Sequence, residues 1–478
     1  MSLEPRNLAG DYRLADYKPL LPLAASTRVL LGQVDKHPSL AHLVDDLGET
    51  STMQHASGRY DVAIGSDPAL GQWLKPGGLL CLLGDSPVPG SDMQAMASWR
   101  ALPGWPAFRA LVPDNRVGHR AAFGALRLLP PRTAAALLGR ISPAWGARLL
   151  PCPGVALYTR GQPPASGIDS LLARADAKLG GEGPFRPEHW LLVSGRLGPG
   201  NPILAFQCDT QGRPQRLIKL ARDRGADHLV REAEQIAAVS KALGPELSRR
   251  VIGPTAETAI DGRHALAYDY VTTRPFRGLR WRLQGRAGLC ASITDWLVDV
   301  AERTRLAADP DSDNRCHRLP LQRLIERNIL PPPLQEQAGR AFEQLQSMPV
   351  LPTVIEHGDL GIYNLRLVSA SGEFKVLDWG SSTFSGIAGG DLLYLLSSAR
   401  APTALATRCL QHYLRALQLP DNAAAALWWS YLARRWAELD TIRPPRPGAP
   451  ESGGGLLLAV HAQVSPTLAM LREHRSSS

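Results

Sequence analysis

The stretch of sequence that decides the fold spans residues 354–367 and reads VIEHGDLGIYNLRL. Its apolar start predicts a short buried strand, which leads into the polar turn His357-Gly358-Asp359. Asn364 follows Asp359 by five positions. A second stretch, FKVLDWG at 374–380, follows a predicted hairpin turn and places Asp378 at the end of another strand. Two aspartates, Asp359 and Asp378, and the amide Asn364 are therefore predicted to lie in loops next to short strands.

These side chains suit the transfer of a phosphoryl group to a hydroxyl. In that reaction one carboxylate orients the acceptor hydroxyl and takes its proton, while oxygen ligands hold Mg²⁺ against the triphosphate. Mg²⁺ favours carboxylate and amide oxygens and keeps several of its waters. Asp359 is therefore the candidate catalytic base, and Asn364 and Asp378 are the candidate metal ligands.

The spacing H-G-D-x-x-x-x-N, followed by apolar residues and D-W-G, resembles the aminoglycoside phosphotransferase and choline kinase group, relatives of the protein kinases. The resemblance covers roughly residues 185–440. It implies the bilobal kinase-like fold, with ATP and Mg²⁺ as cofactors. It also implies that the phosphate acceptor is a hydroxyl of a small molecule.

A kinase-like fold should place a lysine on an inward strand face and pair it with a glutamate on a helix. Lys219 lies in the strand-like segment 216–220. Apolar residues step at helical spacing through 229–243, and Glu232 shares their face, whereas Glu234 points roughly the opposite way. We therefore expect Lys219 to pair with Glu232. The plainer interpretation is a surface ion pair of little energetic weight.

A glycine-rich loop at 194–201, between two predicted strands, is the candidate contact for the ATP phosphates. Gly195, Gly198 and Gly200 would let the backbone approach a phosphate group. Pro199 removes one N–H donor from this loop, and ordinary hairpin turns are also rich in glycine. Phosphate binding and a simple turn are equally good interpretations.

Two further segments take their roles from the resemblance. Segment 267–271 falls where related enzymes place the adenine-binding hinge, so backbone atoms of Asp269, Tyr270 and Val271 are expected to bind the base. Asp391 matches an acidic residue that braces the catalytic loop from a following helix in relatives. A helix N-cap would look the same in the sequence.

Residues 1–165 predict a separate α/β domain. Short apolar runs, the first of them at 28–32, alternate with helical segments and suggest a parallel sheet. The runs at 60–64 and 74–80 resemble the fourth and fifth strands of a class I methyltransferase Rossmann unit. Gly32 is a single glycine where such enzymes have several. We expect a degenerate Rossmann-like scaffold or substrate-presenting domain, in preference to an active methyltransferase.

The predicted architecture is an α/β N-terminal Rossmann-like domain followed by an α+β bilobal kinase-like fold. At 478 residues the chain is too long for one ordinary core, so two or three domains are expected. The predicted boundaries are 1–165 for the Rossmann-like domain, 166–272 for the kinase-like N-lobe and 273–478 for the helical C-lobe with the catalytic loop.

The charge of the chain favours an anionic partner. The formal net charge is +9, segment 115–168 contains seven arginines and no acid, and a second arginine cluster lies at 274–286. These segments could lie on an anionic membrane surface or bind a phosphorylated glycan or lipid, although a solvated face is the plainer interpretation of the first. Aromatic residues make up 6% of the chain and no recognition motif is present, so nucleic acid is not expected.

The cysteine pattern and the hydropathy point to the cytoplasm. The six cysteines are scattered without a CxxC pair, which disfavours a disulfide framework or a zinc site. No run approaches the roughly 18 apolar residues of a membrane-spanning helix, and the start of the chain is no secretory signal. We expect a cytoplasmic protein, with peripheral contact at the inner face of the membrane as an option.

The leading hypothesis is an ATP- and Mg²⁺-dependent phosphotransferase with Asp359 as the base. The acceptor would be a hydroxyl of a small molecule or of a glycan or lipid intermediate, and the arginine clusters favour an anionic one. The alternative is a catalytically inactive kinase-like nucleotide-binding module or scaffold, which the imperfect glycine loop would suit. The fold does not specify the acceptor.

Overall fold

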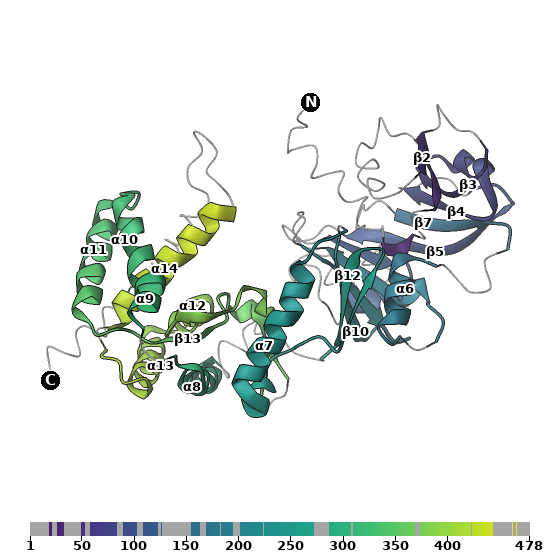
Figure 1. The fold of residues 1–478 in the computed structure, drawn as a ribbon. Coiled ribbons are helices and arrows are strands. Elements are labelled where there is room, and N and C mark those ends of the chain that lie inside the picture. Colours follow the sequence, from purple (N-terminus) through teal and green to yellow (C-terminus); the bar gives the residue numbers. More distant parts are fainter. Residues whose placement is uncertain are drawn as a thin grey trace. The chain divides into compact units, whose positions relative to one another are not determined.

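The chain divides into two compact units (Figure 1). The first comprises residues 1–233 and 254–271, and the second comprises residues 234–253 and 272–478. The predicted N-terminal domain and most of the predicted N-lobe thus fall in the first unit, and the boundary at 165 stays a proposal. The computed structural model describes residues 19–21, 26–32, 49–52, 58–83, 89–102, 109–122, 126, 154–162, 169–181, 183–194, 201–222, 224–271, 286–306, 309–368, 373–421, 423–442, 461 and 465.

A 12-stranded sheet runs through the first unit in the order β11-β12-β10-β9-β8-β6-β5-β7-β4-β3-β1-β2. Its N-terminal strands are β1 (Arg28–Leu31), β2 (Glu49–Thr52), β3 (Tyr60–Gly65), β4 (Leu74–Leu83), β5 (Met93–Leu102), β6 (Arg109–Pro113) and β7 (Gly154–Arg160). The remaining strands are β8 (Trp190–Ser194), β9 (Ile203–Cys208), β10 (Pro214–Leu220), β11 (Ala256–Ile260) and β12 (Arg263–Asp269).

Strands β2, β1, β3 and β4 pair in parallel, which confirms the parallel sheet predicted for this region. Strand β7 then pairs antiparallel with β4, and β5 pairs antiparallel with β7. The 3-10 helix η3 (Pro68–Trp73) connects β3 to β4. The helices expected between β1 and β3 fall outside the described residues, and the Rossmann-like assignment stays a prediction.

Leu70 closes the sheet edge where a Rossmann unit would bind a cofactor. Ligands of such sheets bind at the carboxyl ends of the strands, where the strand order reverses. Gly32 and Gly65 stand at these ends of β1 and β3, and a Cβ built on either would lie 2.6 or 2.7 Å from Cδ1 of Leu70. Leu70 is fully buried. Leu70 therefore fills the space beside Gly32 and Gly65 at this edge.

The two halves of the sheet meet where β6 pairs antiparallel with β8. Strands β8 to β12, which fall in the predicted N-lobe, pair antiparallel with one another and continue the same sheet. Because side chains alternate between the two faces of a strand, one face carries a core that runs from Val29 in β1 to Ala267 in β12. Helix α6 (Leu171–Lys178) packs into this core through Leu172 and Ala175 (Figure 1).

The second unit is mainly helical, as predicted. Its helices are α8 (Arg286–Thr304), α9 (Pro310–Asp313), the π-helix η7 (Asn314–Arg318), α10 (Leu319–Glu326), α11 (Pro332–Ser347), α12 (Gly390–Ser398), α13 (Thr403–Ala416) and α14 (Ala423–Ile442). Its two small antiparallel sheets pair β13 (Thr353–Glu356) with β16 (Thr383–Ile387) and β14 (Leu365–Leu367) with β15 (Phe374–Val376). Helix α7 (His228–Ser248) begins in the first unit and ends in the second.

Among the described helices, none has both the length and the apolar character needed to cross a membrane.

Candidate active site

The buried strand β13 delivers the turn His357-Gly358-Asp359 to the edge of the second unit's core. Gly358 has a φ of 78°, a left-handed conformation that side chains disfavour. A Cβ on Gly358 would lie 2.6 Å from the carbonyl oxygen of Ser381, in the turn that follows Asp378. Glycine is therefore required here for two reasons, and it brings the two motif segments into contact.

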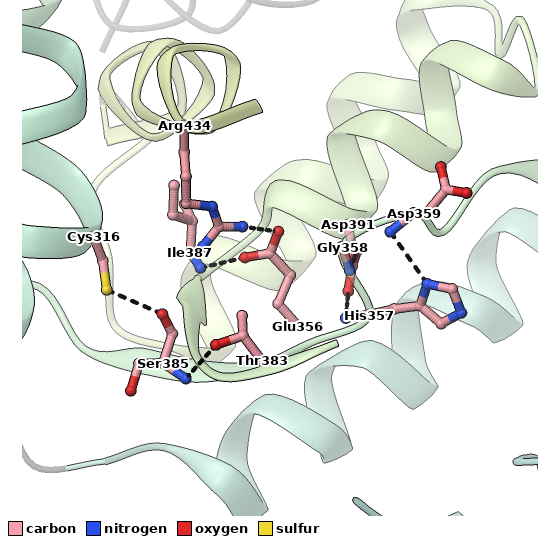
Figure 2. Close-up of polar contacts among 10 residues, drawn as sticks. All are labelled: Cys316, Glu356, His357, Gly358, Asp359, Thr383, Ser385, Ile387, Asp391 and Arg434. Carbon is pink, nitrogen blue, oxygen red and sulfur yellow. Dashed lines mark hydrogen bonds and ion pairs between the residues drawn. The ribbon is translucent and has the colours of Figure 1, made fainter. Parts of the chain in front are cut away.

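Asp391 braces the start of the catalytic loop from helix α12, as the resemblance implies. Its Oδ2 accepts the N–H of His357 at 2.6 Å, and its Oδ1 accepts the N–H of Gly358 at 3.0 Å (Figure 2). The carboxyl group is fully buried. Burial raises the pKa of Asp391 to about 6, although the two N–H donors oppose that rise. The brace thus holds two consecutive peptide groups of the loop.

His357 joins the two motif segments through its ring. Nε2 lies 2.8 Å from the carbonyl oxygen of Leu377, and Nδ1 accepts the N–H of Asp359 at 3.2 Å. Nε2 is therefore the protonated nitrogen, and the ring is a donor to one segment and an acceptor from the other. Burial lowers the pKa of His357, which keeps the imidazole neutral. Its role in the site is to shape the loop.

Glu356 ties the same loop to helix α14. Its carboxylate binds the guanidinium of Arg434 and accepts the N–H of Ile387 at 2.6 Å (Figure 2). Gly386 leaves room for this side chain, since a Cβ there would lie 2.1 Å from Cβ of Glu356. Burial raises the pKa of Glu356, and Arg434 counteracts that rise.

The carboxylate of Asp359 is held at both oxygens. The hydroxyl of Tyr363 donates to Oδ1 at 2.6 Å, and Nδ2 of Asn364 lies 3.2 Å from Oδ2. The same Nδ2 donates to the carbonyl oxygen of Asp359 at 2.9 Å. Asp359 itself is half-buried, and its neighbours His357, Gly358 and Leu360 are buried.

Asn364 and Asp378 flank a pair of antiparallel strands, β14 and β15. Strand β14 follows Asn364, β15 precedes Asp378, and the N–H of Leu377 donates to the carbonyl oxygen of Asn364 at 2.8 Å. Asp378 has φ and ψ of 62°, a left-handed conformation that is strained for a residue other than glycine.

The donor set of Asn364 and Asp378 fits Mg²⁺. The amide nitrogen of Asn364 is used by Asp359, which leaves the amide oxygen as the atom that could bind a cation. Asp378 adds a carboxylate, and hard oxygen ligands of this kind suit Mg²⁺, which usually takes only one or two from the protein. Within the described residues there is no cluster of three or more His, Cys, Asp or Glu side chains that could hold a metal.

In the first unit, Lys219 pairs with Glu232 as predicted. Nζ of Lys219 lies 2.5 Å from Oε1 of Glu232, and both side chains are largely buried. The hydroxyl of Tyr268 donates to the same Oε1 at 3.0 Å, and its ring lies beneath the lysine ammonium. Glu234 is exposed, as the helical spacing indicated. Burial of the pair removes the interpretation as a solvated surface contact.

The other predicted nucleotide contacts are placed only in part. The candidate phosphate contacts Gly195, Gly198 and Gly200 lie outside the described residues. Of the predicted hinge at 269–271, the N–H of Tyr270 already donates to the carbonyl oxygen of Gln215 at 2.9 Å. Binding of a base by the hinge would therefore fall to its other backbone groups, and it stays a prediction.

Two arginines of the basic segment at 115–168 make contacts within the first unit. Arg160 donates to the carbonyl oxygens of Gln72 and Leu74 at 2.8 Å each, and Arg120 donates to the side chain of Gln211 at 3.1 Å. These contacts agree with the plainer interpretation for these two residues. Most of the segment lies outside the described residues, as does residue range 272–285 of the second cluster.

No family model matches the sequence, and no curated protein matches it either. Solved structures do show similarity to this chain. The GDP complex of wild-type aminoglycoside 2'-phosphotransferase-IIIa is 15% identical, with a TM-score of 0.37 over 59% of this chain and 91% of that one. An aminoglycoside phosphotransferase from Alicyclobacillus acidocaldarius is 14% identical, with a TM-score of 0.35 over 60% of this chain and 92% of that one.

A choline/ethanolamine kinase family protein from Mesorhizobium loti is also similar. It is 15% identical to this chain, with a TM-score of 0.35 over 63% of this chain and 98% of that one. The two groups to which these proteins belong are the two that the sequence motif resembles. The resemblance of residues 1–165 to a methyltransferase stays a prediction.

Four residues at these sites are not among the residues predicted from the sequence. Glu356 and Tyr363 lie inside the segment 354–367. A charged residue at the end of an apolar strand and a tyrosine directly before Asn364 could have indicated them. Tyr268 stands inside the predicted hinge segment. Nothing in the sequence around Arg434 indicates a role at the site, because the packing of α14 alone brings it to Glu356.

Proposed function

We propose that this chain is an ATP- and Mg²⁺-dependent phosphotransferase that transfers the γ-phosphate of ATP to a hydroxyl group. The observation that carries the proposal is the set of contacts that hold Asp359 and its loop. Asp391 braces the buried loop that carries it, the residue itself is half-buried, and Asn364 and Tyr363 contact its carboxylate directly. Preorganised groups of this kind supply most of the catalysis in phosphoryl transfer.

Asp359 would act as the general base. The proton of the acceptor hydroxyl passes to its carboxylate as the acceptor oxygen forms a bond to the γ-phosphorus. The bond between that phosphorus and the β–γ bridging oxygen breaks, and ADP leaves with the electron pair. Asn364 and Asp378 would hold Mg²⁺, which when bound neutralises the charge of the phosphates.

The residues of the first unit would bind the nucleotide. Lys219 would neutralise phosphate charge, and Glu232 would orient its ammonium. The backbone at 269–271 would bind the adenine, and the glycine loop at 195–200 would approach the phosphates. The buried state of the lysine pair supports this assignment, because an ion pair held away from water keeps a fixed geometry.

The proposed acceptor is a small molecule or a glycan or lipid intermediate that carries a hydroxyl. The arginines at 115–168 and 274–286 favour an anionic acceptor, since an excess of one charge attracts ligands of the opposite sign. A cytoplasmic location, with peripheral contact at the membrane, is part of the same proposal.

The test is the substitution Asp359→Asn in the full-length chain. ADP release from Mg·ATP would be measured with and without a panel of anionic and neutral hydroxyl acceptors. We expect a loss of about 10²- to 10⁴-fold in kcat, the usual contribution of a general base. The ATP-induced thermal shift should persist. Asp299→Asn, on an exposed face of α8, is the matched control.

Full turnover by a correctly folded Asp359→Asn variant would show that the assigned mechanism is wrong. A thermal shift with ATP, together with no turnover by the wild type on any acceptor, would favour an inactive nucleotide-binding module instead.

A further inference from the structure

Tyr363 is an exposed residue whose hydroxyl is bound to the proposed base. The residue is 39% exposed, yet its hydroxyl donates to Oδ1 of Asp359 at 2.6 Å. The hydroxyl of Tyr394 lies 2.6 Å from that of Tyr363. Because the proton of Tyr363 goes to Asp359, Tyr394 is the donor to Tyr363. The three groups form a chain of hydrogen bonds that ends on the carboxylate.

The loop is built to let the Tyr363 ring fold back toward Asp359. A Cβ on Gly361 would lie 2.3 Å from Cε1 of Tyr363, so the ring occupies the space that a side chain would need. The 3-10 turn η8 (Ile362–Asn364) places Tyr363 next to Asn364. Adjacent residues of one turn therefore hold the two carboxylate oxygens of the same aspartate.

Helix α12 supports this arrangement along one of its faces. Asp391 binds the start of the loop, Tyr394 binds Tyr363, and Oγ of Ser398 accepts the N–H of Ile362 at 3.0 Å. Spacings of three and four residues put these three side chains on one side of a helix. The hydroxyl of Tyr363 is thus fixed by the same helix that braces the catalytic loop.

We propose that Tyr363 is a positioning residue for Asp359. Its hydroxyl, supported by Tyr394, holds one carboxylate oxygen while Asn364 holds the other, so that the base is oriented before the acceptor binds. A carboxylate oxygen has two lone pairs, which leaves room for the acceptor hydroxyl beside the phenol. This inference rests on the proposed phosphotransferase function.

The test compares Tyr363→Phe, Tyr394→Phe and the double variant in steady-state kinetics with Mg·ATP. Small displacements of a catalytic group can reduce the rate by up to about 10²-fold. We expect Tyr363→Phe to lower kcat by about 10- to 100-fold with the KM for ATP unchanged. Tyr394→Phe should lower kcat less. The double variant should match Tyr363→Phe, because the hydrogen bond from Tyr394 goes to the hydroxyl of Tyr363.

Tyr158→Phe, which removes a hydroxyl from β7, is the matched control and should keep the kcat of the wild type. Wild-type kcat in Tyr363→Phe would overturn the inference while leaving the proposed function intact. A double variant whose loss is the product of the two single losses would show that Tyr394 acts independently.

A second measurement does not depend on turnover. In protein labelled with ¹³Cζ-tyrosine, the resonance that disappears in Tyr363→Phe should shift in Asp359→Asn and in Tyr394→Phe. An unshifted resonance in both variants would overturn the hydrogen-bond chain. Absence of any turnover by the wild type would instead contradict the proposed function, so the two failures can be told apart.

Discussion

At the scale of single residues, the site depends on two buried carboxyl groups that lie behind the proposed base. Asp391 and Glu356 are both buried next to the predicted catalytic loop, and neither faces a substrate in the proposed mechanism. Their bonds go to peptide N–H groups and to Arg434. Their protonation states should therefore affect the loop, and through it the position of Asp359.

Asp391 predicts a pH dependence that a variant can isolate. Its pKa of about 6 means that the carboxylate charge, which strengthens both N–H bonds, is lost below that pH. We expect kcat to fall as the pH drops below about 6, and Asp391→Asn to remove this limb from the pH profile. If kcat of the variant still falls below about pH 6, another group is responsible for the fall.

The same pKa fixes the sign of the effect on stability. The folded-state pKa lies above the unfolded value of about 3.9, so the folded state binds the proton more tightly between these two values. The contribution of Asp391 to the free energy of unfolding should therefore decline as the pH rises from about 4 to 6. Urea unfolding of the wild type and Asp391→Asn at pH 4.5 and 7 measures this difference.

At the scale of elements, two helices hold one loop. Helix α12 contacts the loop through three side chains on one face, and α14 contacts it through Arg434. Helix α14 lies far along the chain from β13, yet its guanidinium neutralises the charge next to the His-Gly-Asp turn. The catalytic loop is thus clamped at both ends of its backbone by helices that follow it in the sequence.

Replacing one partner of the Glu356–Arg434 pair should lower the free energy of unfolding substantially. Removal of one member of a buried ion pair leaves an uncompensated charge and typically costs about 3–5 kcal/mol. We expect Glu356→Gln and Arg434→Met each to lower the free energy of unfolding by about this amount, and the double variant to lose less than the sum of the two single losses. Denaturant unfolding provides the measurement.

The exposed pair Glu336–Arg340 on α11 is the matched control for this experiment. Glu336→Gln should change the free energy of unfolding by less than about 1 kcal/mol, as is usual for surface pairs. Equal losses for Glu336→Gln and Glu356→Gln would mean that burial does not govern the strength of the pair.

At the scale of the whole molecule, the first unit joins two predicted domains through one sheet. Strand β6, which belongs to the predicted N-terminal domain, pairs with β8 of the predicted N-lobe. Trp99 of β5 reaches across β6, and its Nε1 donates to the carbonyl oxygen of Trp190 at 3.3 Å. A shared core runs along the same face, so the two halves should unfold together.

Trp99→Ala tests this cooperation. Trp99 is almost completely buried, and truncation of a buried tryptophan costs about 3–5 kcal/mol. We expect hydrogen exchange to lose protection in β3 and β4 and also in β9 and β10. Loss confined to β1–β7 would show that the halves are independent. Leu306→Ala, at an exposed position, should change protection little.

The sequence by itself determined the local features of this protein. The polar turn, the amide five residues later and the strand-end aspartate are encoded by spacing along one segment, and the short strands by their apolar runs. Lys219 and Glu232 could be paired in advance because helical spacing assigns Glu232 to the buried face. Such patterns depend only on neighbours in the chain.

Only the tertiary structure decided which distant residues meet. Arg434 lies 78 positions from Glu356, and Tyr394 lies 31 positions from Tyr363. Strands β6 and β8 likewise pair with each other, although nothing in the sequence of either strand indicates its partner. These contacts depend on how whole elements pack and which strand edges pair, and no local spacing records that choice. For this reason the motif and its brace Asp391 could be found in the sequence, whereas the contacts of Arg434 and Tyr394 with it could not.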